Sequence, residues 1–192
     1  LRSNLLKPAD AFVVEPNVDL RKRAADLGAT AVDAVDALPA GLTPGLVVLA
    51  VKPQVIRNVT EGYRSIAARG ATFVSVAAGT KIETFEAILG AQTPVIRCMP
   101  NTPAAIGKGM MVVFANANVA PAVLDRVRVL FSAIGEVASI DDENLMDAVT
   151  AVSGSGPAYV FHFIECLTEA GVSAGLPRDT AKLLALQTVY GA

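Results

Sequence analysis

Short apolar runs alternate along much of the chain with longer segments in which apolar positions recur every three or four residues. The short runs are typical of β-strands and the longer segments of amphipathic helices. The predicted strands cover residues 11–15, 29–32, 46–51, 72–77, 94–99, 109–114 and 136–140. The helices predicted between them cover residues 18–27, 54–68, 82–89 and 119–134. The run at 46–51 is continuously apolar, as expected of a central parallel strand that is covered on both faces.

The order of these elements predicts an α/β fold. Strands that alternate with helices form a doubly wound parallel sheet, and such a sheet binds its ligands beyond the carboxyl ends of its strands. From residue 143 onward almost every segment is helical: 143–152, 157–174 and 178 to the end. We therefore expect a domain boundary near 141–143, between a sheet domain at 1–142 and a helical domain at 143–192.

The helical domain is rich in Ala, Leu and Val. Three such helices have more apolar surface than they can bury among themselves, so we expect a homodimer or a higher homo-oligomer formed through these C-terminal helices. The run from Ser153 to Pro157 is expected to separate the first two helices. Pro157 and Pro177 each suit the first position of a helix, where the N–H that proline lacks has no partner.

Composition and charge exclude several classes of function. Charged residues make up 18% of the chain, against about 25% in an average soluble domain. The net charge of −2 is spread without blocks of like charge, which argues against a nucleic-acid partner. No window reaches about 18 uninterrupted apolar residues, so no membrane-spanning helix is expected. The N-terminal residues do not resemble a secretory signal, and we expect a cytoplasmic protein.

Cysteine and histidine usage does not indicate a metal centre. Cys98 and Cys166 are far apart and lack C-x-x-C spacing, so we expect two free buried thiols, with a disulfide as the alternative. His162 is the only histidine, and no carboxylates cluster to form a ligand set, so no metal site is expected. We interpret His162 as a packed or interface residue.

A dinucleotide-binding sheet usually opens with a strand and a G-x-G-x-x-G turn that holds the pyrophosphate at a helix N-terminus. Here the only G-x-G pairs are Gly107-x-Gly109 and Gly154-x-Gly156, and neither has the third glycine. The chain begins where the second strand of such a sheet would begin. We therefore expect a first strand, its glycine turn and a helix to precede residue 1 in the complete protein, because a sheet without them would leave neighbouring strands unpaired.

Three predicted strands end in small or polar residues at the edge of the sheet where ligands are expected. These residues are Ala50, Val51, Lys52 and Pro53 at the end of the strand at 46–51, Ala77, Ala78 and Gly79 at the end of the strand at 72–77, and Met99, Pro100 and Asn101 at the end of the strand at 94–99. Lys52 either faces cofactor phosphates or a substrate carboxylate, or lies in solvent at a helix start. The residues at 77–79 either let a flat ring approach the backbone or form a plain turn. Pro100 and Pro103 stiffen the loop around Asn101.

The densest cluster of glycine and hydroxyl residues is the segment from Thr150 to Pro157. If a helix begins at Pro157, the preceding N–H groups are free and favour a bound carboxylate. Ser153, Gly154 and Ser155 are therefore candidates for substrate binding, and Thr150, one turn earlier, is expected to point into the same pocket. In the alternative interpretation, Ser155 is only the N-cap at a kink between two helices.

Glu15 ends the strand predicted at 11–15. In dinucleotide-binding sheets an acidic residue at this point accepts a hydrogen bond from the 2′-OH of the adenosine ribose and repels a 2′-phosphate. Glu15 therefore favours NADH over NADPH as the cofactor. Arg21 and Arg23 in the following helix partly reverse that preference.

Several segments, in this order, resemble the pyrroline-5-carboxylate reductase family. They are AVKPQ (50–54), AAG (77–79), VIRCMPNTP (95–103), DAVTAVSGSGPAY (147–159) and GLPRDTA (175–181). The likeness spans essentially the whole chain, and VIRCMPNTP together with SGSGPAY is highly specific. It implies a Rossmann-type dinucleotide-binding domain followed by an all-helical dimerisation domain. The implied reaction is hydride transfer from NADPH or NADH to the C=N bond of 1-pyrroline-5-carboxylate, the last step of L-proline biosynthesis.

The resemblance also implies roles for individual residues. Cofactor contacts would fall at 50–53 and 77–79, with Met99, Pro100 and Asn101 beside the nicotinamide. Substrate contacts would fall at Thr150, Ser153, Gly154 and Ser155. We assign Asn101 to the substrate and Thr150 to a hydrogen bond near the ring nitrogen. The family's glycine turn and its Ser-Pro-Gly-Gly loop have no counterpart within the 192 residues.

Two other interpretations are open. One is a reductase of the same architecture that acts on a different imine or hydroxy acid, which a panel of substrates would distinguish. The other is a non-catalytic relative that only dimerises through its helices, for which the lack of the glycine turn is the sole support.

Overall fold

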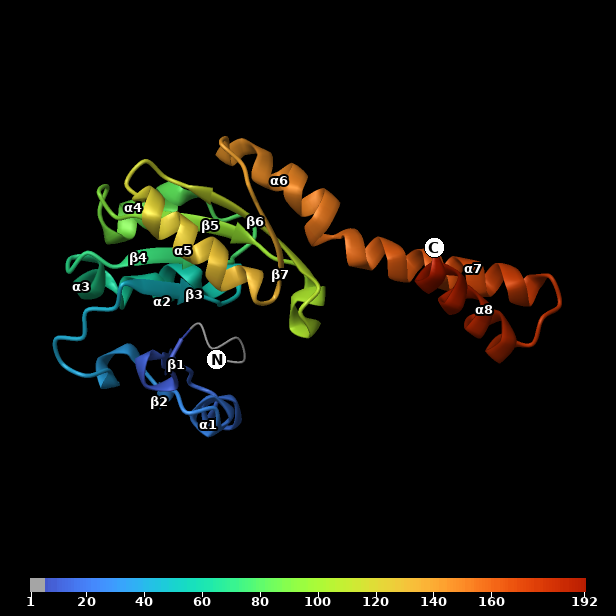
Figure 1. Ribbon diagram of the computed structural model, residues 1–192, viewed down its shortest axis with the longest axis horizontal. Helices are drawn as coiled ribbons and strands as arrows, with labels where there is room; N and C mark the ends of the chain where they lie inside the picture. Colours follow the sequence, from blue (N-terminus) through green and yellow to red (C-terminus); the bar gives the residue numbers. More distant parts are fainter. Residues whose placement is uncertain (1–5) are drawn as a thin grey trace.

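The computed structural model describes residues 6–192. Figure 1 shows three parts in chain order: a small N-terminal lobe, a five-stranded sheet with its helices, and a helical arm that projects from the sheet. Together they confirm the predicted fold class, an α/β sheet followed by helices.

The sheet has the order β3-β4-β5-β6-β7. Its strands are β3 (Leu46–Leu49), β4 (Thr72–Ser75), β5 (Val95–Met99), β6 (Gly109–Ala115) and β7 (Gly135–Ser139). All neighbouring strands are parallel except β5 and β6, which run antiparallel. This exception follows from the link between them, a 3-10 turn at Thr102–Ile106, because a parallel crossover needs about a dozen residues or more.

Helices cover both faces of the sheet. On one face lie α2 (Ile56–Glu61), α3 (Arg64–Ala67) and α4 (Ile82–Leu89), and on the other lies α5 (Pro121–Ser132). Successive strand residues point to opposite faces, so Phe73 packs against α4 whereas Val74 packs on the side of α5. Both of these residues are fully buried. The two cores hold β4 and β5 rigidly, and these strands carry predicted site residues at their ends.

The helix predicted at 54–68 is interrupted. A 3-10 turn at Pro53–Val55 precedes α2, and Gly62 and Tyr63 separate α2 from α3. At the interruption the Gly62 N–H donates to Val59 O at 3.2 Å and the Tyr63 N–H donates to Thr60 O at 3.0 Å. These bonds span three residues instead of four, so the backbone tightens at this point.

The N-terminal lobe contains the parallel pair β1 (Phe12–Val14) and β2 (Thr30–Val32), joined by α1 (Val18–Asp26). This pair is a sheet of its own, beside the larger one (Figure 1). Within residues 6–192, β3 pairs only with β4, and Val48 in β3 is 43% exposed. Among the described residues β3 therefore lies at an edge of the sheet, and the prediction of a central strand covered on both faces stays a prediction, because it depends on the strand expected before residue 1. A strand before residue 1 stays a prediction.

The arm begins with a 3-10 turn at Glu143–Leu145, which leads into α6 (Met146–Val149). A π-helical segment at Thr150–Gly154 joins α6 to α7 (Gly156–Ser173), and α8 (Arg178–Gly191) folds back along α7. The break predicted at 153–157 is present but narrow: the π segment ends at Gly154, α7 begins at Gly156, and only Ser155 lies between them. Pro157 is the second residue of α7, and Pro177 is the N-cap of α8 instead of its first residue.

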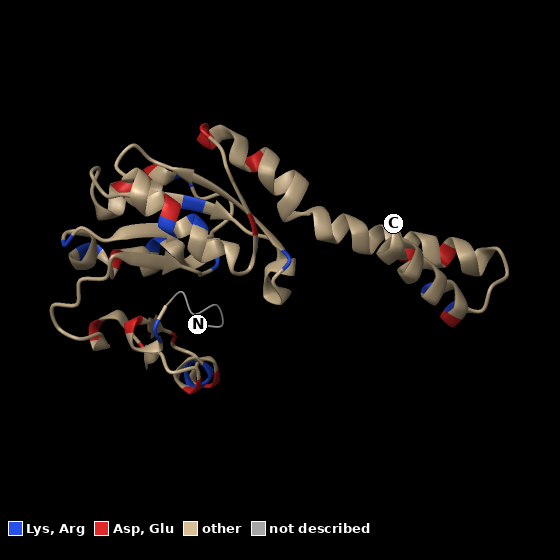
Figure 2. Cartoon of the chain, viewed as in Figure 1, with Lys and Arg blue, Asp and Glu red and all other residues tan. Residues whose placement is uncertain are grey.

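The first half of α7 has no charged residue, which leaves it uncoloured in Figure 2. Between α7 and α8 the closest approach involves Gly171, where a Cβ would come within 3.0 Å of the Ala181 side chain. Across residues 6–192, no helix combines the length and the hydropathy that crossing a membrane requires.

Candidate functional site

The ends of three parallel strands lie along one edge of the sheet. Leu49 pairs with Ser75, and Ser75 pairs with Arg97. Because β3, β4 and β5 run in the same direction, the segments that follow them, 50–53, 77–79 and 99–101, lie next to one another at the carboxyl edge. This is the edge at which doubly wound sheets bind their ligands.

Small residues keep this edge open near Gly79. Gly79 has a positive φ of 70°, a conformation that favours glycine. A Cβ at this position would have no atom within 4 Å, so a ligand has room to approach the backbone. The Ser75 hydroxyl accepts a hydrogen bond from the Ala77 N–H at 3.2 Å, which orders the turn before Ala78.

Lys52 is exposed and directly precedes the 3-10 turn that starts at Pro53. Its ammonium has no hydrogen bond or ion pair within the part of the chain that the structure describes. The position is compatible with both interpretations of Lys52, a phosphate or carboxylate contact and a solvated lysine at a helix start.

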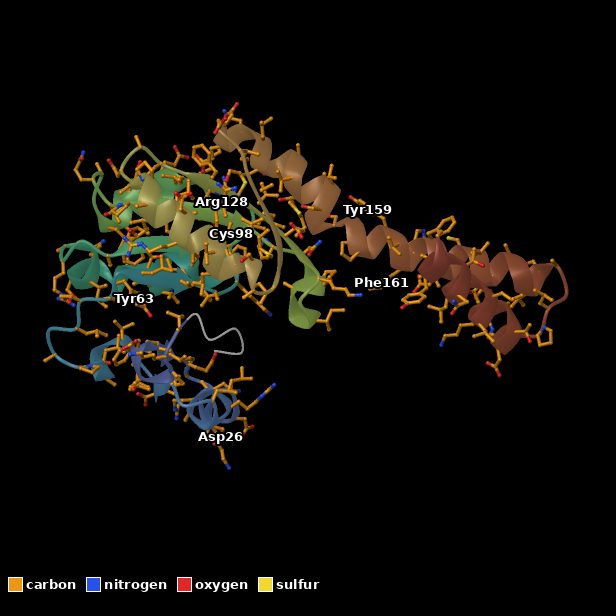
Figure 3. All side chains as sticks on the ribbon, viewed as in Figure 1. Asp26, Tyr63, Cys98, Arg128, Tyr159 and Phe161 are labelled. Atoms are coloured by element: carbon orange, nitrogen blue, oxygen red, sulfur yellow. The ribbon has the colours of Figure 1, made fainter. Side chains whose placement is uncertain are left out.

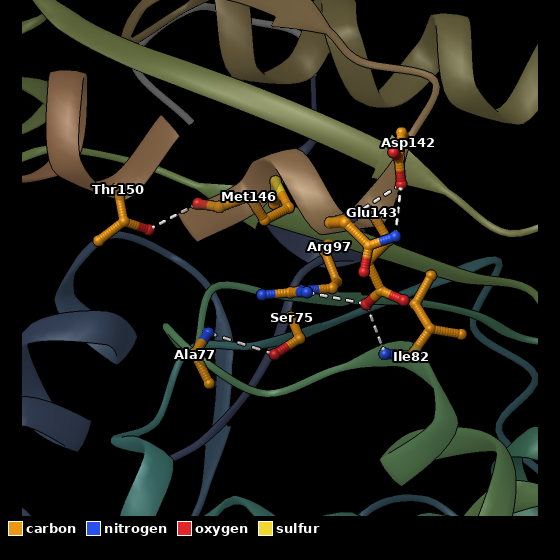
Figure 4. Close-up of polar contacts among 9 residues, drawn as sticks. Ser75, Ala77, Ile82, Arg97, Asp142, Glu143, Met146 and Thr150 are labelled. Atoms are coloured by element: carbon orange, nitrogen blue, oxygen red, sulfur yellow. Dashed lines mark hydrogen bonds and ion pairs between the residues drawn. The ribbon is translucent and has the colours of Figure 1, made fainter. Parts of the chain in front are cut away.

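An ion pair that the sequence analysis missed joins the arm to the sheet (Figure 4). Arg97 Nη1 lies 2.8 Å from Glu143 Oε1, and the Arg97 side chain is only 7% exposed. The same carboxylate oxygen accepts a hydrogen bond from the N–H of Ile82, the first residue of α4, at 2.8 Å. An arginine within a buried apolar strand needs a partner, and that was the available signal in the VIRCM run.

A cavity of about 150 Å³ lies between the sheet edge and the arm. Its lining residues are Gly79, Lys81, Arg97, Glu143, Asn144 and Asp147. Of the predicted site residues only Gly79 lines this cavity, opposite Asp147 of α6, the helix that precedes the π segment. A larger cavity of about 460 Å³ lies between the 35–42 loop and α2 and α3, and no predicted site residue lines it.

Asn101 connects the end of β5 to the π segment. Its Oδ1 accepts a hydrogen bond from the Met110 N–H at 2.8 Å, and its Nδ2 donates to Ser153 O at 3.1 Å. Beside it, Met99 packs against Gly154, where a Cβ would come within 2.5 Å of Met99 Cε. Two segments separated by about fifty residues are thus in direct contact, and a larger residue at 154 would require the end of the Met99 side chain to move.

The hydroxyl groups of the π segment are oriented by the helix itself. Thr150 Oγ1 donates to Met146 O at 2.9 Å (Figure 4), and Ser153 Oγ donates to Val149 O at 3.1 Å. The Ser155 N–H, expected to be free for a carboxylate, donates to Thr150 O at 2.8 Å. That part of the prediction was wrong, because the π segment that precedes α7 uses this N–H, although α7 does begin next to it, at Gly156 with Ser155 as its N-cap. The Ser155 hydroxyl has no hydrogen-bond partner among the described residues.

Glu15 lies at the end of β1 in the separate lobe. Its Oε1 accepts a hydrogen bond from the Asn17 N–H at 2.9 Å. Arg21 folds back on the same turn, where its Nη1 donates to Glu15 O at 2.9 Å and to Pro16 O at 3.1 Å. The guanidinium group is therefore bound to the backbone, and the effect of Glu15 and Arg21 on cofactor preference stays a prediction.

The two thiols differ in environment. Cys98 is buried among the sheet residues (Figure 3), and this burial raises the pKa of its thiol to about 12. Cys166 is exposed, so the prediction of two buried thiols was wrong for the second. Its Sγ lies 3.6 Å from His162 Nε2 on the surface of α7. Within residues 6–192, no three His, Cys, Asp or Glu side chains are arranged to hold a metal ion.

Comparisons with known proteins agree with the resemblance to pyrroline-5-carboxylate reductases that the sequence motifs indicated. Residues 143–192 match the family model described as pyrroline-5-carboxylate reductase dimerisation. The chain is 40% identical over 193 residues to a pyrroline-5-carboxylate reductase of Pseudomonas aeruginosa, covering all of this chain and 70% of that protein.

Two solved structures extend this likeness to three dimensions. A pyrroline-5-carboxylate reductase from Coxiella burnetii matches with a TM-score of 0.85 and 32% identity, over 94% of this chain and 67% of that one. The Plasmodium falciparum pyrroline carboxylate reductase with NADP bound matches with a TM-score of 0.83 and 30% identity, over 99% of this chain and 69% of that one.

Proposed function

Because the chain belongs to the pyrroline-5-carboxylate reductase family, whose members reduce 1-pyrroline-5-carboxylate to L-proline with NAD(P)H, we propose that its sheet edge holds the cofactor while its π segment holds the imine. One observation supports this division above all others. Asn101 at the sheet edge donates to Ser153 O of the π segment at 3.1 Å, which brings the two sets of candidate residues to one place.

The sheet edge suits a nicotinamide cofactor. The candidate cofactor contacts are Ala50, Val51, Lys52, Pro53, Ala77, Ala78, Gly79, Met99 and Pro100. The space beside Gly79 allows a flat ring to approach the backbone, because no protein atom lies where a Cβ would be. When bound, the cofactor supplies the hydride. The task of these residues is orientation, which can contribute up to about 7–11 kcal/mol to catalysis.

The π segment suits the imino acid. Thr150 Oγ1 gives its own proton to Met146 O, so its lone pairs are available to accept a hydrogen bond from the N–H of a protonated imine. The free hydroxyl of Ser155 and the backbone beside Ser153 and Gly154 are proposed to bind the carboxylate. A protonated imine needs no general acid, which is compatible with a site that offers hydroxyls and amides.

The arm is proposed to form a homodimer or a higher homo-oligomer through α7 and α8. Tyr159 and Phe161, both labelled on α7 in Figure 3, are 59% and 62% exposed. Apolar side chains of this size need a partner surface. The protein is proposed to act in the cytoplasm, where its free thiols would persist, and Glu15 is proposed to favour NADH.

The test is oxidation of NADH or NADPH by the full-length protein with 1-pyrroline-5-carboxylate, beside a panel of other imines and hydroxy acids. Strong preference for the cyclic imino acid is expected, and preference for another substrate would contradict the proposal. The ratio of kcat/KM for the two cofactors measures the expected preference for NADH.

Thr150→Ala tests the role of the π segment. Loss of one hydrogen bond to a charged group should lower kcat/KM by about 10-fold to 100-fold, while cofactor affinity stays near normal. Thr168→Ala is the matched control, because the Thr168 hydroxyl makes the same kind of bond to Ile164 O in α7. An equal loss of cofactor binding in Thr150→Ala would contradict the assignment.

A further inference from the structure

The carbonyl group of Ser153 has no partner within its own helix. In an α-helix it would accept from the N–H of residue 157, but residue 157 is proline and has no N–H. In a π-helix it would accept from residue 158, but the Ala158 N–H donates to Ser155 O at 2.9 Å. Pro157 therefore leaves a carbonyl without a helical donor in the segment that carries the candidate substrate residues.

The side chain of Asn101 supplies the missing donor. Its Nδ2 lies 3.1 Å from Ser153 O, in a partly buried setting. The other end of the same amide is fixed, because Oδ1 accepts from the Met110 N–H at the start of β6 at 2.8 Å. One partner is a donor and the other an acceptor, so only one orientation of the amide satisfies both. Pro100 and Pro103 restrict the loop on either side.

We propose that Asn101 is a positioning residue: it replaces the hydrogen bond that Pro157 removes and thereby fixes the Ser153–Ser155 turn against the sheet edge. Its catalytic effect rests on the proposed function, and it acts through the turn without contacting the substrate. This differs from our expectation that Asn101 binds the substrate directly. The amide is the hydrogen-bonded link between the turn and the end of β5, where Met99 also packs against Gly154.

A pH profile of Asn101→Asp is the first test. An ionised aspartate still accepts from Met110 N–H but places a carboxylate oxygen against Ser153 O, whereas a protonated aspartic acid can donate to it. At pH 8 the kcat/KM should fall by about 10-fold to 100-fold relative to wild type. The ratio of the variant's kcat/KM to that of the wild type should then recover as the pH falls through the pKa of the introduced carboxyl group.

Asn118→Asp is the matched control for this profile. The Asn118 Nδ2 donates to Ala91 O at 2.9 Å, far from the arm, so its ratio to wild type should stay near one at every pH. If the ratio for Asn101→Asp did not change with pH, the donor role would be wrong. A similar loss at every pH would indicate a direct substrate contact or general disruption.

A double-mutant cycle with Pro157→Ala is the second test. Alanine at position 157 restores an N–H that can donate to Ser153 O. In the wild-type background, with Pro157 present, Asn101→Ala should lower kcat/KM by about 10-fold or more. In the Pro157→Ala background the same substitution should lower kcat/KM by less than about 3-fold. The same coupling should be measurable in urea midpoints. Equal losses in both backgrounds would overturn the proposal. If the wild-type protein does not reduce the imine, the proposed function fails, yet the urea midpoints still measure the coupling.

Discussion

The sheet buries its large apolar side chains, whereas the arm leaves many of its large apolar side chains exposed. In the sheet, Phe73, Val95 and Val113 are completely buried by neighbouring strands and helices. In the arm, Phe163 is 58% exposed and Leu183 65% exposed. The sheet therefore gains its hydrophobic stabilisation within one chain. The apolar side chains of the arm contribute such stabilisation only when another surface covers them.

The few buried residues of the arm show how the difference arises. They are Met146, Thr168, Ala181 and Ala185. Apart from Met146, these are small or polar side chains at the contact between α7 and α8, so the helix pair packs closely but buries little apolar area. Its large side chains point outward, as expected of helices that complete a core with a second copy of the chain.

The largest expected effect is in the sheet. Phe73→Ala should lower the free energy of unfolding by about 3–5 kcal/mol, because it leaves a cavity in a closed core. Urea unfolding followed by circular dichroism measures this, since the chain has no tryptophan. Phe163→Ala in the arm is the counterpart, and at low protein concentration it should cost far less. Equal losses would mean that the arm has a closed core as well.

A charge on the exposed face of the arm should change assembly instead of folding. Phe161→Lys is expected to weaken self-association by about 2 kcal/mol, close to 30-fold in Kd. Sedimentation velocity over a range of concentrations gives the Kd. Val129→Lys is the control, because Val129 is 54% exposed on α5 of the sheet unit. If it dissociated the oligomer equally, the interface would not be confined to the arm.

The junction between the two regions depends on the ion pair of Arg97 and Glu143. Glu143→Ala should lower stability by about 1 to 2 kcal/mol, because it leaves a buried guanidinium and the Ile82 N–H without their acceptor. Glu143→Gln keeps an acceptor oxygen and should cost less. Thermal melts of the two variants give the order, and the reverse order would exclude the acceptor role.

The smallest expected effect appears at alkaline pH. Burial raises the pKa of Cys98 to about 12 from an ordinary 9.0. Above pH 9 the unfolded chain loses this proton and the folded chain keeps it, so stability falls as the pH rises toward 12, by about 1 kcal/mol at pH 10. Burial also raises the pKa of Tyr63, which acts in the same direction.

Urea midpoints between pH 8 and pH 10 measure this slope. Cys98→Ala should flatten it, and Cys166→Ala in the arm, where the thiol is exposed, should leave it unchanged. A slope that is insensitive to Cys98→Ala would assign the alkaline loss to other groups.

The fold was predictable where one local pattern determined each element. The continuous runs at 72–77 and 94–99 became β4 and β5, and the helix at 82–89 was correct to the residue. The direction of β6 was not predicted, because strand polarity depends on the short link at Thr102–Ile106 and not on the strand's own pattern.

The site was predictable in its location but not in its hydrogen bonds. The three strand ends and the Thr150–Ser155 segment could be named from the sequence. The serine and glycine residues at 153–156 correctly suggested a helix start, since α7 begins at Gly156, but they did not reveal the π segment before it, in which the Ser155 N–H donates to Thr150 O. The ion pair of Arg97 and Glu143 and the bridge at Asn101 join distant segments, and no local pattern encodes which side chains will meet.

The π segment has one further consequence. Because its hydrogen bonds span five residues, it accommodates one more residue than an α-helical turn, and each residue of an α-helix turns the chain by about 100°. The extra residue at Thr150–Gly154 therefore determines how α7 is rotated about its own axis relative to α6. Removing it would rotate the exposed apolar side chains of α7 about the helix axis by roughly a quarter turn, and with them the direction from which the proposed second copy of the chain would have to approach.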